Sequence, residues 1–191
     1  MKNMSGKKIA LISIFSVLGM IIILMIGSYN SLVKKREAVS GQSSNIETQL
    51  QRRLDLIPKL VNTVKGYVKH ESGVIAQVSD ARSKLAGAGG MRDKAAADAE
   101  VSSAVSRLLA ITENYPDLKA NAQFTQLSDE LAGTENRIAV ARKDYNQATE
   151  NYNNSITTFP AAIIANMFGF SLVDYFKSDS SAKNAPDVSF D

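Results

Sequence analysis

The residues that could support catalysis or metal binding are few and widely spaced. The chain has no cysteine and one histidine, His70. Zinc sites use several His or Cys ligands, and a serine nucleophile needs a base beside it, so one histidine is typical of neither chemistry. Asp129, Glu130 and Glu135 lack the Glu-x-x-His motif of di-metal sites in helical bundles. We therefore expect no catalytic residue, no metal and no cofactor, and we interpret His70 and these carboxylates as solvated.

The glycine cluster at residues 87–90 differs from a phosphate-binding loop. It lacks the Lys-Ser/Thr ending of such a loop, and no strand pattern precedes it. We interpret it as a connection between helices.

The charge distribution does not indicate nucleic-acid binding. The chain has 22 Lys and Arg against 19 Asp and Glu, and three lysines near the N-terminus (Lys2, Lys7 and Lys8) account for the excess. Nucleic-acid binding needs basic residues gathered on one face, so we expect none.

Polar residues beside predicted core positions are the candidate functional residues. One group flanks a proline, and the other accompanies a row of aromatic residues. We expect them to fix the register of two long helices, and the alternative is a surface that binds a partner. The set consists of Arg52, Arg53, Asp55, Pro58, Arg142, Asn146 and Asn153.

An apolar segment near the N-terminus is the strongest single feature of the sequence. Residues 9–27 form a run of 19 residues without a charge. A helix of that length measures about 28 Å, which matches a hydrocarbon core of about 30 Å. The run exceeds the length of a signal-peptide core, and Gly27-Ser28-Tyr29 is a poor cleavage site. The sequence thus predicts a transmembrane helix at residues 9–28 after a short segment 1–8. Three basic residues on each side favour neither orientation.

The remaining chain has the periodicity of long amphipathic helices. A stripe with spacings of three and four residues runs from Ile46 to Val78 and predicts one helix from Tyr29 to about Leu85, kinked at Pro58. The apolar segment is expected to continue into this helix without a break. A second helix is predicted from Lys94 to Asn114, where Tyr115-Pro116 ends it. Residues 29–176 would form one helical domain, and residues 177–191 a flexible tail.

A third helix, which Asn121 would cap, has a seven-residue repeat. Such a repeat favours coiled-coil-like packing. Pro160 would open a short fourth helix, and Gly169 would end it. Together these helices predict an all-α protein, with one transmembrane helix followed by a long antiparallel bundle of about three main helices. The repeat comprises Phe124, Leu131, Ile138, Tyr145, Tyr152 and Phe159, with Leu127, Ala141, Ala148 and Ile156 in the companion row.

Colinear sequence strings from Tyr29 to Phe190 resemble the LemA family. The most specific is residues 49–61, QLQRRLDLIPKLV, although the family usually has Asn where Lys59 stands. Others are YPDLKAN at 115–121, ENRI at 135–138 and the pairs Tyr145-Asn146 and Tyr152-Asn153. The alanine-rich stretch 87–106 matches the family little. The resemblance implies a bacterial single-pass membrane protein with a helical domain and no established enzymatic activity. It also implies a link to membrane proteases of the HtpX type.

These observations lead to one preferred function and several alternatives. We expect a non-enzymatic scaffold or adaptor in the bacterial cell membrane, bound to the lipid bilayer through residues 9–28. It would form a homo-oligomer or bind a membrane protein, for which the resemblance suggests an HtpX-type protease. The alternatives are a membrane-tethered signalling or sensor component, an enzyme acting on lipid or cell wall, and interfacial membrane remodelling. Nearly balanced charge on the third helix speaks against the last.

Overall fold

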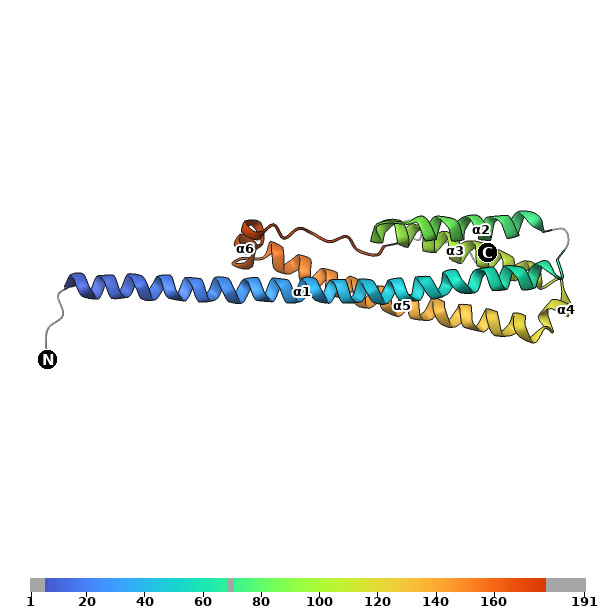
Figure 1. Ribbon diagram of the computed structural model, residues 1–191, viewed down its shortest axis with the longest axis horizontal. Helices are drawn as coiled ribbons and strands as arrows, with labels where there is room; N and C mark the ends of the chain where they lie inside the picture. The colour runs from blue at the N-terminus through green and yellow to red at the C-terminus, as the bar shows by residue number, and fades with distance from the viewer. Residues whose placement is uncertain (1–5, 69–70, 178–191) are drawn as a thin grey trace, which may run out of the picture. The chain divides into compact units, whose positions relative to one another are not determined.

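The computed structural model describes residues 6–68 and 71–177, and all regular structure within them is helical (Figure 1). This confirms the all-α fold class. His70, residues 1–5 and nearly all of the predicted tail lie outside the described residues, and the predicted domain boundaries stay predictions. The helices are α1 (Gly6–Lys65), α2 (Ser72–Gly87), α3 (Met91–Thr112), α4 (Pro116–Lys119), α5 (Ala122–Thr157) and α6 (Ala161–Phe168).

Helix α1 continues from the apolar segment into the amphipathic stripe without a break, as expected, and it contains Pro58. Among the described residues, α1 is the helix that is long and apolar enough to cross a membrane. A stretch near its start has a mean hydropathy of 2.6. Between Leu11 and Ile26, the large apolar side chains other than Met25 are exposed. This is consistent with a membrane location.

The prediction of one helix up to Leu85 was wrong, because α1 ends at Lys65 and α2 begins at Ser72. Glycine lowers helix stability by about 1 kcal/mol relative to alanine, and Gly66 stands directly at the break. The Gly66 N–H bonds back to the Thr63 carbonyl at 3.3 Å, and the Val68 N–H to the Val64 carbonyl at 3.0 Å. These two bonds close the last turn of α1. The bundle therefore has four main helical segments where the sequence predicted about three.

The chain divides into two compact units, and α1 and α5 supply residues to both. The first unit comprises residues 1–41 and 147–173, and the second comprises residues 42–146 and 174–191. Helices α2, α3 and α4 belong wholly to the second unit, and α6 belongs to the first.

The second unit is a bundle of the later part of α1, α2, α3 and the earlier part of α5. Lys84 pairs with Glu100 and Gln77 with Arg107, so α2 and α3 run antiparallel. Gln49 bonds to Arg137 and Arg52 pairs with Glu130, which makes α1 antiparallel to α5. The apolar core includes Ile46, Leu50, Ile57, Leu60, Val64, Val78, Val101, Leu108, Leu118 and Ile138.

The first unit packs α6 and the end of α5 against the earlier part of α1. Tyr152 and Ile156 of α5 are buried, as are Leu32 and Val39 of α1. Helix α6 lies beside α1 (Figure 1), where the Tyr29 ring contacts the Phe168 ring with 4.9 Å between centroids. Gly169 ends α6 in the left-handed conformation, with φ of 72°, as the sequence predicted.

Two local predictions for α5 have clear outcomes. Asn121 caps the helix, because its Oδ1 accepts the Phe124 N–H at 3.0 Å, as expected. The seven-residue row is buried from Phe124 to Tyr152, but Phe159 is 78% exposed. The expectation that Phe159 belongs to the core row was wrong. Helix α5 ends at Thr157, so Phe159 no longer follows the helical repeat.

Candidate functional site

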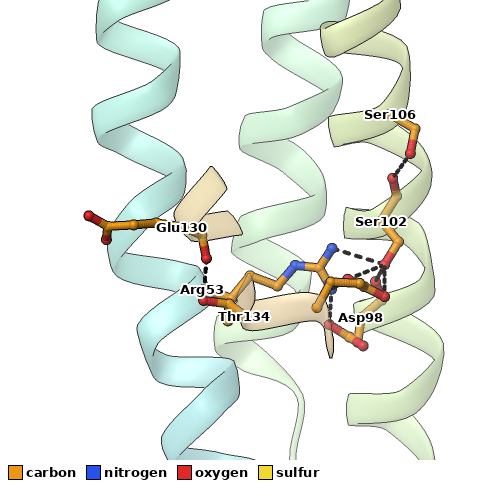
Figure 2. A network of polar contacts seen from close by, with 7 residues as sticks. Arg53, Asp98, Ser102, Ser106, Glu130 and Thr134 are labelled. Carbon is orange, nitrogen blue, oxygen red and sulfur yellow. Dashed lines mark hydrogen bonds and ion pairs between the residues drawn. The ribbon is translucent and has the colours of Figure 1, made fainter. Parts of the chain in front are cut away.

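Arg53 is the centre of a buried polar network in the second unit (Figure 2). Its Nη1 lies 2.6 Å from Asp98 Oδ1 of α3 and 2.8 Å from Glu135 Oε2 of α5. Its Nη2 donates to Ser102 Oγ at 2.9 Å. The Arg53 side chain is 5% exposed, whereas that of Glu135 is 49% exposed. One guanidinium thus connects three helices, two of them through carboxylates.

The helical periodicity explains why Arg53 is buried. Ile46, Leu50, Ile57 and Leu60 are buried on α1, and Arg53 occupies the position between them at spacings of three and four residues. Asp98 occupies the corresponding place on α3, three residues before the buried Val101. Each is a charged residue in an apolar stripe, and such residues are buried only when they are paired.

The environment of Asp98 combines two opposing electrostatic effects. The pKa of the Asp98 carboxyl is raised, with burial as the largest cause, although the Arg53 guanidinium lowers it through its charge and its hydrogen bond. Glu135 raises the pKa further, and Arg142 lowers it. The attraction of Arg53 and Arg142 therefore does not fully offset the cost of removing the Asp98 carboxylate from water. The arrangement suits a structural contact between α1, α3 and α5, because the donors of Arg53 face partners within the bundle.

Asn146 and Asn153 each hold the backbone of the extended segment 170–177 that follows α6. In the first unit, Asn153 Nδ2 donates to the Val173 carbonyl at 2.9 Å, and Asn153 Oδ1 accepts the Val173 N–H at 3.0 Å. In the second unit, Asn146 makes the same two bonds to Phe176, at 3.1 and 2.8 Å. Each amide satisfies both backbone groups of one residue, as a neighbouring strand would.

A tyrosine precedes each of these asparagines and donates its hydroxyl to a carbonyl of the same segment. Tyr145 Oη bonds to the Asp174 carbonyl at 2.8 Å, and Tyr152 Oη to the Ser171 carbonyl at 3.0 Å. Both rings are buried. Burial raises the pKa of Tyr152, against a smaller lowering by Arg36, so the hydroxyl keeps the proton that this bond requires.

The spacing of the two Tyr-Asn pairs fits the spacing of the residues they bind. The pairs are seven residues apart, which corresponds to about 10.5 Å along a helix. The contacted residues, 171 and 174 or 173 and 176, are three apart, which corresponds to about 10 Å of extended chain. At Tyr145 and Tyr152, two positions of the seven-residue repeat are thus matched to a non-helical segment of the same chain.

Of the other predicted site residues, Arg142 lies beside the clamped Phe176, and the remaining three lie apart from the network and the clamps. Arg52 is exposed, pairs with Glu130 at 3.7 Å, and lines an open groove of about 860 Å³ with Asp55 and Arg137. The Arg142 guanidinium lies 6.0 Å from the centroid of the Phe176 ring. Pro58 lies inside α1. Five residues of the predicted set therefore fall into three groups: Arg53 in the buried network, Asn146 and Asn153 as backbone clamps, and Arg52 and Asp55 in the exposed groove.

Sequence reasoning missed Asp98, Ser102 and the segment 170–177. Asp98 could have been found as the acidic residue in the apolar stripe of the alanine-rich helix, since Ala95, Val101 and Val105 are buried around it. Among residues 6–68 and 71–177, no group of three or more His, Asp or Glu side chains lies close enough to hold a metal ion.

Comparison of the sequence with known proteins identifies the family of the chain. The sequence model of the LemA family matches residues 42–190. Magnetosome protein MamQ 2 of Paramagnetospirillum magneticum is 29% identical over 192 residues, which cover 87% of this chain and 70% of that protein. Magnetosome protein MamQ of Magnetospirillum gryphiswaldense is 29% identical, covering 86% and 70%. Protein LemA of Metamycoplasma hominis is 25% identical, covering 90% and 79%. Because the family model matches well over half of the residues, the chain belongs to the LemA family.

Proposed function

We propose that the protein is a non-enzymatic, membrane-anchored adaptor that presents its helical bundle to a membrane-protein partner. Residues 9–28 of α1 cross the bilayer once, and the second unit carries the docking surface. A membrane protease of the HtpX type is the first partner to test, on the strength of the family resemblance. The similarity to magnetosome proteins and to a protein LemA supports an adaptor that works in more than one cellular structure.

The observation that carries the proposal is the continuity of α1. One helix of 60 residues contains both the exposed apolar segment and the core stripe of the bundle. An anchor that continues into the domain as helix, without a flexible linker, suits a protein that holds a surface near the membrane. The residues with most capacity for chemistry, Arg53 and Asp98, are engaged with each other inside the bundle.

The exposed groove on the second unit is the surface we assign to the partner. It is lined by residues of α1 together with Arg137, and its polar side chains of both charge signs include Arg52 and Asp55. Arg residues are enriched where proteins bind each other, since a guanidinium stacks and donates several hydrogen bonds. A polar groove of this kind fits a reversible adaptor contact better than a permanent apolar interface.

Photocrosslinking in living cells tests the proposal. A photoreactive amino acid is placed at Arg52 or Asp55 in the full chain, and adducts are identified by mass spectrometry. Lys84 on α2 provides the matched control, because its side chain is also exposed and charged but lies outside the groove. We expect one dominant heterologous membrane protein from Arg52 and Asp55 and none from Lys84.

Other outcomes would change the assignment. Adducts only to a second copy of the chain would replace the adaptor with a self-assembling scaffold. Equal labelling of many proteins from all three positions would overturn the docking surface. A dominant adduct to a small metabolite or lipid precursor would favour an enzyme or a carrier instead.

A further inference from the structure

Helix α6 presents an apolar face that nothing in the first unit covers. Ile164 and Ala165 point into the unit and are buried, whereas Ile163, Met167 and Phe168 are each at least 53% exposed. Residues 163 and 167 are one helical turn apart, so they share a face. Phe159 before the helix and Leu172 after it are exposed as well. Contiguous exposed apolar side chains of this kind mark a surface that meets another apolar medium.

The charge pattern around α6 suits lipid. Residues 151–173, between Glu150 and Asp174, contain no Asp, Glu, Lys or Arg. A charged side chain costs several kcal/mol within the hydrocarbon region, so an uncharged stretch can enter it without that penalty. A surface that binds a soluble protein would ordinarily have a polar rim with charged residues.

The position of α6 within the first unit also favours a contact with lipid. Tyr29 lies two residues beyond the apolar segment of α1, and its ring contacts both Phe168 and Phe170. A groove of about 600 Å³ has Ile23 and Leu24 of α1 on one side and Phe159 and Ala161 on the other. The residues around α6 are therefore level with the last turns of the segment proposed to cross the bilayer.

The far end of that groove has the chemistry of a headgroup region. Lys35 Nζ donates to Ser155 Oγ there, and Lys34 and Arg36 are its neighbours in sequence. Twelve residues separate Ile23 from Lys35, or about 18 Å along the helix. Tyr29 lies between the apolar and basic ends and contacts the rings of Phe168 and Phe170, and tyrosine is enriched at membrane interfaces.

We infer that α6, with Phe159 and Leu172, inserts into the lipid leaflet beside α1 and gives the protein a second membrane contact. This inference rests on the proposed anchoring through α1. The exposed face of Ile163, Met167 and Phe168 meets acyl chains, and Lys34, Lys35 and Arg36 meet the phosphates. A short apolar helix without charged side chains can enter the acyl-chain region without the cost of burying a charge.

Tryptophan fluorescence tests the inference directly, because the chain has no Trp. The full chain is reconstituted in vesicles of phosphatidylcholine and phosphatidylglycerol, as the single variants Phe168→Trp and Ile163→Trp. Ile163 provides a reporter on the same face that does not take part in the Tyr29 ring contact. Val140→Trp, an exposed apolar position on the second unit, is the matched control, and Phe15→Trp reports the anchor. Far-UV circular dichroism checks that each variant keeps its helix content.

We expect the emission of the F168W and I163W variants to shift to the blue and to lose intensity with lipids brominated on the acyl chain. The V140W variant should instead be quenched by aqueous iodide. Quenching of F15W by bromolipid, with F168W and I163W quenched by iodide, would overturn the inference and leave the anchor intact. Protection of F168W and I163W from both quenchers would mean that protein covers α6 and would also overturn it. Failure of F15W to respond to bromolipid would instead contradict the anchoring itself.

Discussion

Arg53 on α1 and Asp98 on α3 form an ion pair of 2.6 Å, and their side chains are only 5% and 10% exposed. A buried ion pair adds little net stability, because loss of hydration offsets the attraction. It does discriminate between packing arrangements. If α3 slid along α1 by one turn, each charge would face an apolar stripe without its partner. We interpret the pair as the contact that selects one register.

Replacing Arg53 with methionine should strongly destabilise the protein. The substitution leaves Asp98 buried without its guanidinium, and breaking one side of a buried pair costs about 3 kcal/mol or more. Chemical denaturation of the full chain in detergent, followed by circular dichroism, measures the free energy of unfolding.

The neighbouring Arg52 provides the control for this experiment. Its side chain is 55% exposed and pairs with Glu130 at 3.7 Å, so Arg52→Met should change stability by less than about 1 kcal/mol. The double variant Arg53→Met, Asp98→Leu should recover much of the loss, because no buried charge is then left without a partner and Glu135, whose side chain is 49% exposed, keeps contact with water. Equal losses for Arg52→Met and Arg53→Met would contradict a special role for the buried pair.

Stability should also depend on pH through Asp98. Its pKa is raised in the folded protein from 3.8, first by burial, so the folded chain binds this proton more tightly than the unfolded chain does. The contribution of Asp98 to stability is therefore complete below the unfolded pKa and is lost as the pH rises through the folded pKa. Asp98→Asn cannot titrate. Denaturation midpoints of both proteins across this range should differ by an amount that changes with pH, and a constant difference would contradict the prediction.

The sequence predicted the helices more successfully than their contacts, for physical reasons. Periodicity and capping depend on residues within one turn, so the ends at Asn121 and Gly169 could be predicted, whereas α3 ends at Thr112, two residues before the predicted end at Asn114. The end of α1 at Lys65 could not, because Gly66 weakens a helix without deciding whether tertiary packing compensates for it. Phe159 was assigned to the core because a repeat continues in sequence even after the helix has ended.

The candidate residues were found without their partners. Arg53, Asn146 and Asn153 are polar residues next to apolar rows, and that local pattern identified them. Asp98 lies 45 residues from Arg53, and Val173 lies 20 residues from Asn153. No helical period relates such positions. The seven-residue repeat has two explanations in sequence, a helical partner or an extended one, and only the tertiary structure distinguishes them.

Removing either asparagine clamp should release one part of the segment 170–177. Asn153→Ala eliminates both hydrogen bonds to Val173, and Asn146→Ala both bonds to Phe176. Each lost bond corresponds to about 1 kcal/mol, so amide exchange should accelerate by a factor of roughly 10 or more. Hydrogen exchange read by NMR or mass spectrometry should show the change at Val173 in one variant and at Phe176 in the other.

Asn151 gives a matched control for the clamps, because it is an exposed asparagine on the same helix. Asn151→Ala should leave the exchange of both amides unchanged. If the three variants accelerated exchange equally along the whole segment, the asparagines would not act as local clamps. The contribution of the tyrosines can then be separated with Tyr145→Phe and Tyr152→Phe, which remove a hydroxyl and keep the buried ring.

Two glycines should respond in opposite directions to substitution by alanine. Gly169 has φ of 72°, a conformation that costs a residue with a side chain about 1 kcal/mol or more. Gly169→Ala should therefore destabilise the protein. Gly41 lies inside α1, and a methyl group added there meets no atom within 4 Å. Gly41→Ala should stabilise the protein by up to about 1 kcal/mol, since alanine is the better helix former. Thermal denaturation of both variants in the same detergent measures the two effects, and a loss of stability in both would show that Gly41 serves a close contact instead.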